Sequence, residues 1–219
     1  MDANTTLTRL RSLADPANRA GMARFGIDTE RALGIKIPEL RRLAKEIGTD
    51  HDLARALWDT GVHEARILAG LIADPSRATL PLLDRWARDF NSWDLCDLVC
   101  ANFIDRTRVA WTLPARWARR EEEFVRRAAF ALIAALAVHD TAAPDERFVR
   151  LFPLIKRYAT DERNFVKKAV NWALRQIGKR NARLRKRAIA LAREIRAIDS
   201  RSARWIAADA LRELNTRKK

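Results

Sequence analysis

The chain has 219 residues, with only 7 Gly and 7 Pro, and a formal charge of +15 at pH 7. So few Gly and Pro argue against a loop-rich or all-β protein, and no apolar run reaches the about 20 residues of a transmembrane helix. The first residues lack the basic-then-apolar order of a signal peptide. We therefore expect a cytoplasmic protein, large enough for one core or for a stack of helical repeats.

The charge is confined to one half of the chain. Residues 1–110 hold 16 Lys+Arg and 16 Asp+Glu, whereas residues 111–219 hold 27 Lys+Arg and 12 Asp+Glu, so the second half carries the whole +15. A solvated, arginine-rich surface explains many arginines but not their confinement. This asymmetry favours a polyanion as the partner, most simply nucleic acid.

Apolar residues recur at helical spacing almost throughout, and no segment alternates as a strand would. Pro38 suits a first helical turn, Gly48 and Gly178 suit helix ends, and Asp74-Pro75 marks a break. The spacing predicts helices over residues 3–14, 17–25, 38–47, 51–58, 62–74, 78–89, 92–104, 107–118, 121–138, 144–158, 162–178, 181–197 and 199–214.

A weak repeat runs through these helices. A charged residue leads an apolar stretch of helix at steps of 31, 30, 41 and 36 residues, at Arg66, Asp97, Arg127, Lys168 and Arg204. Helix-pair repeats of about 30–45 residues indicate a HEAT-like solenoid. We predict an all-α, single-domain superhelix over residues 1–219, with a basic concave groove that these five residues line.

Two tryptophans each lie one helical turn from a charged residue. Trp93 and Asp97 are four residues apart, as are Lys168 and Trp172, so each pair shares a helix face. Indole rings and a carboxylate suit a flat cationic ligand, and a lysine suits a phosphate. Two alternatives remain open: the tryptophans pack in the core, or Asp97 is a buried ion-pair partner of a basic residue in the next repeat, such as Arg127 or Lys168.

The remaining reactive side chains point to no metal or cofactor. Cys96 and Cys100 are four apart on one predicted helix and are expected to be small core residues, because a disulfide is unusual in a reducing compartment. The three histidines, His51, His63 and His139, fall at no ligand spacing. Asp94 is expected at a helix start. Five further tryptophans are expected to pack between helices: Trp58, Trp86, Trp111, Trp117 and Trp205.

Four motifs stand in order along most of the chain: Gly34-Ile35-x-x-Pro38-x-x-Arg41, Trp93-Asp94-x-x-Asp97, Arg127-Ala128-Ala129, and Lys168-Ala169-x-x-Trp172-x-Leu174-Arg175. Together they resemble the AlkD-like DNA alkylation repair family, which consists of alkylpurine DNA glycosylases built from HEAT-like repeats. The resemblance covers about residues 33–214 and is weakest over residues 1–32. One departure is Ser92, where the best-known active members carry a second Trp.

The resemblance implies a monofunctional glycosylase that excises positively charged N3- or N7-alkylated purines from double-stranded DNA, in base excision repair and without a metal or cofactor. It implies Asp97 as the catalytic carboxylate, with Trp93 and Trp172 facing the cations. Contacts to DNA would come from Arg127 and Lys168, together with Arg126, Lys167, Arg175, Arg204 and Arg66. A monomer in the bacterial cytosol or nucleoid is expected by analogy.

Two other functions fit the same sequence. One is a non-catalytic scaffold that recognises distorted or branched DNA, since the family contains such relatives. The other is a solenoid adaptor that binds proteins and has no DNA affinity. Both DNA-binding interpretations predict affinity that falls steeply with salt, and catalysis separates them.

Overall fold

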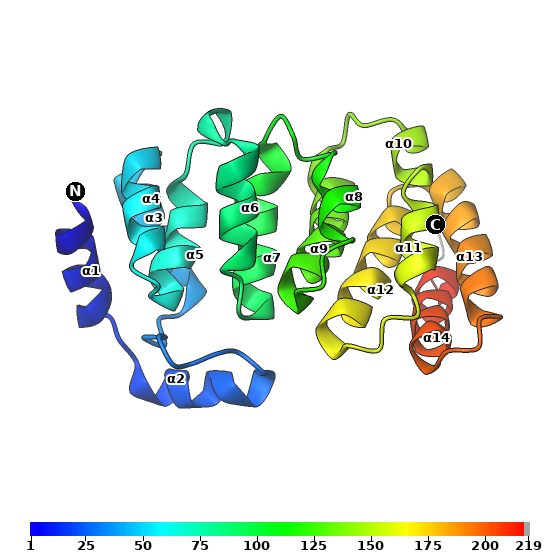
Figure 1. The fold of residues 1–219 in the computed structure, drawn as a ribbon, viewed down its shortest axis with the longest axis horizontal. Helices are drawn as coiled ribbons and strands as arrows, with labels where there is room; N and C mark the ends of the chain where they lie inside the picture. The colour runs from blue at the N-terminus through cyan, green and yellow to red at the C-terminus, as the bar shows by residue number, and fades with distance from the viewer. Residues whose placement is uncertain (217–219) are drawn as a thin grey trace. The chain divides into compact units, whose positions relative to one another are not determined.

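The computed structural model describes residues 1–216 and contains only helices, turns and loops over that range (Figure 1). The chain divides into two compact units, Met1–Val109 and Ala110–Lys219. Unit 1 has no net charge and unit 2 carries the +15. The counts are the same as those for residues 1–110 and 111–219, since Ala110 is uncharged. The single-domain organisation stays a prediction, and each unit is described by itself.

Unit 1 consists of short helices whose starts have clear chemical causes. Asp2, Asp15, Asp50 and Thr79 each cap a helix by accepting a hydrogen bond from a backbone N–H in its first turn. The helices are α1 (Ala3–Ser12), α2 (Pro16–Met22), η1 (Ala23–Phe25), α3 (Ile37–Ile47), α4 (His51–Asp59), α5 (His63–Ile72), η2 (Pro75–Arg77), α6 (Leu80–Arg88), α7 (Trp93–Asn102) and η3 (Ile104–Arg106).

Aromatic rings form the core between α4 and α6. The rings of Trp58 and Trp86 are stacked, with centroids 4.0 Å apart and an interplanar angle of 1°. Helices α5 and α7 pack closely at Gly70. A Cβ at this position would lie only 2.9 Å from Cγ2 of Val99. The tryptophan stack and the close approach at Gly70 hold successive helix pairs in register.

Unit 2 is built around two long helices that pack along each other, α9 and α12. Most of α9 is buried, and its run of Ala and Leu lets neighbouring helices approach closely. The helices are α8 (Leu113–Trp117), α9 (Glu123–His139), α10 (Asp145–Val149), α11 (Phe152–Tyr158), α12 (Asn164–Lys179), α13 (Ala182–Arg196) and α14 (Arg201–Thr216).

Most predicted helices are confirmed to within a few residues, and the two clear differences involve proline. The helix predicted over residues 107–118 is reduced to α8, in which Pro114 occupies the first turn. The helix predicted over residues 144–158 is split into α10 and α11, with Pro153 in the first turn of α11. Proline lacks a backbone N–H and clashes with the preceding turn, so it starts a helix more readily than it continues one.

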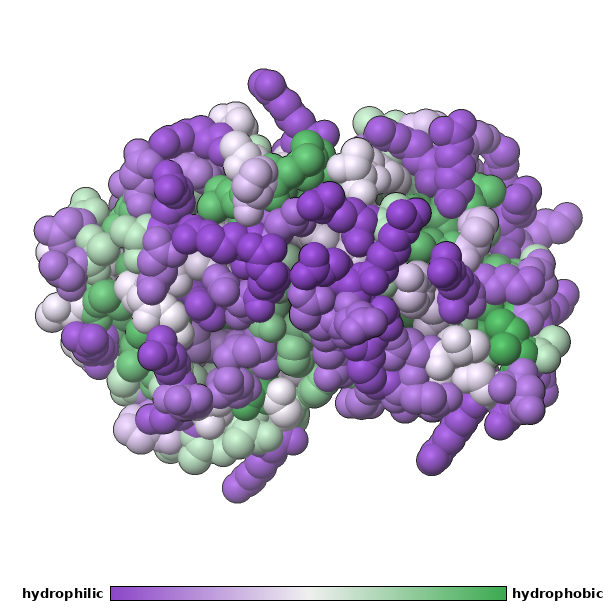
Figure 2. Space-filling model, viewed as in Figure 1, coloured by the Kyte–Doolittle hydropathy of each residue, from purple (hydrophilic) through white to green (hydrophobic). Residues whose placement is uncertain are grey.

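The face of the molecule in Figure 2 is covered mainly by hydrophilic side chains in both units. Among residues 1–216, no helix combines the length and the hydropathy that a membrane crossing requires. The few large apolar side chains that are exposed include Phe25, which is 70% exposed, and Trp205, which is 41% exposed.

Candidate functional site

Trp93 is the first residue of α7, and its ring is held in place by the N-terminal segment of unit 1. The indole Nε1 donates a hydrogen bond to the backbone oxygen of Phe25 at 3.0 Å. Two residues earlier, the Asn91 side chain donates to Oδ2 of Asp28 at 2.6 Å. The start of α7 is therefore tied to the loop after η1, and the half-buried Trp93 ring has a defined orientation.

Asp97 lies one turn further along α7 and is half-buried. The motif spacing therefore predicted correctly that Trp93 and Asp97 share one helix. Behind them, Cys96 and Cys100 are fully buried free thiols, as expected for core residues. Burial, with a smaller contribution from the Asp97 carboxylate, raises the pKa of the Cys100 thiol well above its ordinary value. The fully buried Cys100 thiol is therefore a poor nucleophile at neutral pH.

An apolar pocket of about 410 Å³ lies beside Trp93 in unit 1. Its walls come from α2, α3, α5, α7 and the segments beside them, and most of its lining residues are apolar: Asn18, Met22, Ile27, Ile35, Lys36, Ile37, Pro38, His63, Glu64, Ile67, Trp93 and Asp94. A flat or apolar group that contacts the Trp93 ring would have this hollow next to it.

A buried ion pair braces the wall of this pocket. His63 Nε2 lies 2.9 Å from Asp94 Oδ2, and their side chains are only 3% and 13% exposed. Burial alone would lower the pKa of His63, but the hydrogen bond to Asp94 and its charge raise the pKa above its ordinary value. Burial likewise opposes the ionised Asp94, yet His63 keeps the pKa of Asp94 below its ordinary value. At mildly acidic pH, below the ordinary histidine pKa of 6.5, the two residues therefore form a charged pair.

Glu64 explains the first of the four motifs. Its carboxylate is 1% exposed and accepts hydrogen bonds from the backbone N–H groups of Leu33, Gly34 and Ile35 at 2.7, 2.6 and 3.2 Å. Gly34 has a φ of +81°, and a Cβ there would lie 2.2 Å from the backbone oxygen of Asp15. Only glycine fits this position, which lets the segment leading into α3 pack directly against the start of α2.

In unit 2, the two adjacent arginines of α9 bind other parts of the protein. Arg127 is 5% exposed and donates to the backbone oxygen of Phe165 at 2.7 Å. Arg126 donates to the backbone oxygen of Ala118 and to Oδ2 of Asp161, both at 2.9 Å. Both side chains thus tie α9 to the segments before and after it, so a phosphate contact by Arg127 would use the small part of the side chain that remains exposed.

The α12 helix presents the second tryptophan motif. Lys168 is exposed and Trp172, one turn later, is half-buried, so the predicted pair shares one helix. The neighbouring Lys167 places Nζ 5.7 Å from the ring centroid of Trp205 on α14. Trp205 is thus not a core residue as predicted but a partly exposed ring that is covered by a lysine, whereas Trp58, Trp86 and Trp117 are buried as predicted.

The other predicted DNA contacts all have acidic neighbours. Arg66 lies 3.7 Å from Oδ2 of Asp89 and donates to the backbone oxygens of Trp58 and Asp89. Arg175 pairs with Glu213 and lies 3.5 Å from Asp209. Arg204 is exposed and pairs with Asp199 at 2.9 Å. These charges are partly neutralised by the protein itself.

Sequence reasoning missed the His63–Asp94 pair, although a signal was present. The two residues are 31 positions apart, the same step that separates the repeat anchors Arg66 and Asp97. The same separation joins the indole N–H of Trp58 to Oδ2 of Asp89 at 2.7 Å. In unit 2 the corresponding bond, from Asn171 to Asp209, spans 38 residues. A search for complementary polar residues one repeat apart would have found these bonds.

Within the part of the chain that the structure describes, no three His, Cys, Asp or Glu side chains lie close enough to hold a metal ion. The helix pairs and their repeat-spaced bonds define a HEAT-like helical-repeat protein. A solved structure with the same fold has a TM-score of 0.79 and 21% sequence identity, and the match covers 97% of this chain and 95% of that one. That structure represents a new family of proteins related to the HEAT-like repeat DNA glycosylases with affinity for branched DNA structures.

The sequence model of the DNA alkylation repair enzyme family matches residues 6–214. The match spans almost the whole chain, and the protein therefore belongs to that family. No curated protein sequence matches the chain. The resemblance inferred from the four motifs and the HEAT-like fold are both confirmed.

Proposed function

We propose that this protein is a monofunctional DNA glycosylase that removes positively charged N3- or N7-alkylated purines from duplex DNA. The observation that carries the proposal is the arrangement on α7: the half-buried ring of Trp93, fixed by its bond to Phe25, and the Asp97 carboxylate one turn away. In this proposal, the protein acts as a monomer in the cytosol.

The proposed chemistry requires electrostatic stabilisation more than proton transfer. Alkylation gives the base a formal positive charge, so the base leaves as a neutral molecule with the electron pair of the glycosidic bond. The sugar that remains is oxocarbenium-like, and the Asp97 carboxylate stabilises this cation and orients a water molecule for attack at C1′. Water supplies the new hydroxyl and releases its proton to solvent. The Trp93 ring stabilises the cations through its π-face.

Unit 2 supplies the second set of proposed contacts. Trp172 on α12 offers another half-buried ring, and Lys168 offers an exposed charge one turn away. In this proposal Lys168 is the principal phosphate contact of unit 2, and Trp172 is its aromatic contact to DNA. The half-buried Lys167 on α12 and the exposed Arg204 on α14 extend the proposed phosphate-binding surface.

A non-catalytic role in binding branched or distorted DNA is the second candidate. Ser92 stands before Trp93, where active relatives carry another tryptophan, and it is buried at the helix start. The structural relative with affinity for branched DNA has the same fold over 97% of this chain. Both features favour a protein that binds unusual DNA and leaves the base in place.

The test is single-turnover release of base from a duplex that carries one N7-methylguanine, with wild type beside Asp97→Asn. We expect Asp97→Asn to slow release by about 10²–10³-fold, and to change the Kd for the same duplex by less than about twofold because the shape is kept. Equal release by both proteins would remove Asp97 from the reaction. No release by either, with salt-sensitive binding intact, would support the binding role, and branched DNA would then be the substrate to test.

A further inference from the structure

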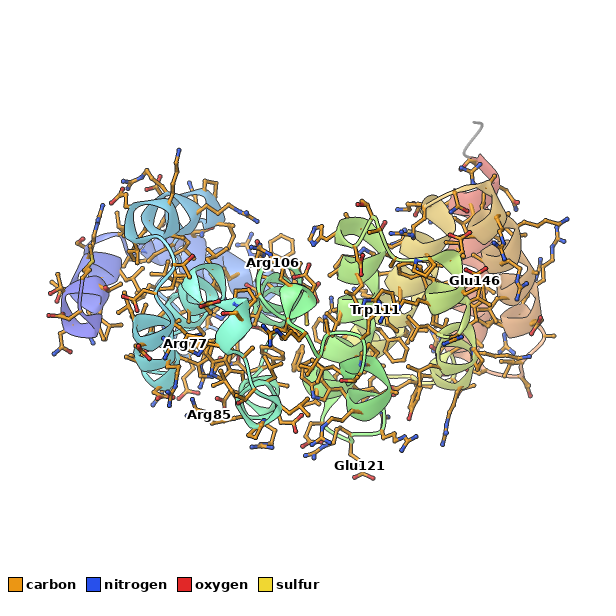
Figure 3. All side chains as sticks on the ribbon, turned by 90° about the horizontal axis from the view of Figure 1, so that it is seen from above. Arg77, Arg85, Arg106, Trp111, Glu121 and Glu146 are labelled. Atoms are coloured by element: carbon orange, nitrogen blue, oxygen red, sulfur yellow. The ribbon has the colours of Figure 1, made fainter. Side chains whose placement is uncertain are left out.

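A second hollow lies in unit 1, away from Trp93 and Asp97. It has a volume of about 370 Å³ and is lined by side chains of α4, η2 and α6: His51, Arg55, Arg77, Thr79, Pro81, Leu82 and Arg85. None of these residues lines the pocket beside Trp93. Figure 3 labels Arg77 and Arg85, which come from η2 and α6.

Three guanidinium groups from three different elements surround this hollow. Arg77 pairs with Asp52 at 2.9 Å and Arg85 pairs with Asp59 at 3.0 Å, and the two arginine side chains are 49% and 42% exposed. Within residues 1–216, Arg55 has no carboxylate at ion-pair distance. The lining itself contains no acidic residue, but Asp52 and Asp59 neutralise two of its three arginines, so Arg55 supplies the net positive charge of the hollow.

His51 forms a wall of the hollow, and one of its ring nitrogens, Nδ1, lacks a hydrogen-bond partner among residues 1–216. The side chain is at the start of α4 and only 5% exposed, and its Nδ1 is buried with no hydrogen-bond partner in the described chain. Burial is the main cause that lowers the pKa of His51, and the charges of Arg77 and Arg55 add to it, against Asp52 and Asp74.

We propose that this hollow, defined by His51, Arg55, Arg77 and Arg85, is a binding site for a phosphate group. Guanidiniums recognise phosphate oxygens by charge-assisted and often bidentate hydrogen bonds. The first turn of α6 also lines the hollow, with Thr79 as its cap, and helix starts favour anions. The apolar Pro81 and Leu82 leave room for the group that carries the phosphate.

The phosphate can belong to the backbone of DNA or to a free nucleotide, and the same measurement distinguishes them. Because the chain has three histidines, the imidazole proton resonances are few, and a His51→Gln variant identifies the one from His51. Inorganic phosphate, a 5′-mononucleotide and a short undamaged duplex would each be titrated into the full chain. We expect phosphate to shift the His51 resonance and to raise the pKa of His51, because a bound anion favours the protonated ring.

Arg55→Gln is the test variant, with Arg85→Gln as a second and Arg41→Gln as the matched control. Arg41 is exposed on α3 and loses the same charge in the same unit. We expect Arg55→Gln to weaken phosphate binding by about tenfold and the control to change it by less than about twofold. A response to the duplex, with a salt dependence reduced by about 0.9 in Arg55→Gln, assigns the site to DNA backbone. A response to phosphate and mononucleotide alone assigns it to a free nucleotide.

The site is disproved if none of the three probes shifts the His51 resonance. Equal weakening by Arg55→Gln and Arg41→Gln also overturns it, because binding would then be a general attraction to positive charge. Base release plays no part in these measurements, so the phosphate site stands or fails independently of the proposed glycosylase.

Discussion

Unit 1 has no net charge and unit 2 carries all of it, although both are stacks of helix pairs of similar length. Unit 1 joins its repeats with an indole N–H, an imidazole and a stacked tryptophan pair, alongside the guanidiniums of Arg66, Arg77 and Arg85. Unit 2 joins its repeats largely with guanidiniums, those of Arg126, Arg127, Arg175 and Arg180. Net charge therefore overstates the positive surface that unit 2 offers to DNA, because part of it holds the fold together.

The largest effect on stability is expected at the buried carboxylate of unit 1. Glu64→Ala leaves the N–H groups of residues 33–35 without their acceptor, and we expect the free energy of unfolding to fall by at least about 3 kcal/mol. The control is Glu46→Ala, which removes only exposed pairs with Arg9 and Arg42 and should cost less than about 1 kcal/mol. Urea unfolding of the full chain measures both. Similar losses for the two variants would show that Glu64 does not anchor the loop.

Effects of intermediate size are expected from two substitutions in unit 2, one of a buried structural arginine and one of an exposed lysine proposed to contact DNA. Arg127→Ala should lower the free energy of unfolding by about 2 kcal/mol, because a buried charged donor is lost from Phe165. Lys168→Ala should change it by less than about 0.5 kcal/mol, but should reduce the slope of log K against log salt for duplex binding by about 0.9. Unfolding curves and salt titrations check these values. The opposite pattern, with Arg127 governing the salt slope, would place Arg127 on the DNA surface after all.

The smallest effect is a pH dependence that belongs to unit 1. The pKa of His63 is raised in the folded protein, so its contribution is complete below the ordinary value of 6.5 and is lost as pH rises through the folded value. The pKa of Asp94 is lowered, so its contribution is present above the ordinary value of 3.8 and is lost as pH falls through the folded value. The pair therefore stabilises most between these limits. Asp94→Asn should flatten the fall in unfolding free energy on the alkaline side, as urea unfolding at several pH values would show; an unchanged slope would contradict the charged pair.

Much of the fold followed from sequence because its signals are local. Helical spacing, the proline in a first turn at Pro38 and the glycine at a helix end at Gly48 act within a few residues. The change in charge near residue 110 needed only counting. The proline breaks before α8 and α11 were missed since apolar spacing continues across Pro114 and Pro153. The spacing of apolar side chains carries no information about the backbone N–H that a proline lacks.

The candidate site was predictable only in part. The motif placed Trp93 and Asp97 on one helix, but nothing in the spacing shows that a carbonyl from Phe25 holds the indole. The hollow at His51 and Arg55 was not predicted either, because its lining comes from three elements and matches no motif. Burial decided the remaining cases: Arg127 and Lys168 look alike as basic residues in sequence, yet one is buried and the other exposed.

The bonds between successive repeats span about one repeat, 31 residues for His63–Asp94 and 38 for Asn171–Asp209. During synthesis on the ribosome, each new helix pair can therefore dock on the pair before it as soon as it emerges. The bond from Trp93 to Phe25 is different, because it joins residues 68 positions apart. The segment that contains Phe25 is synthesised first, and about two further repeats must follow before Trp93 is available to bond with it. The proposed lesion contact is thus among the last features of unit 1 to form, and a truncated or stalled chain would lack it while its earlier repeats were already folded.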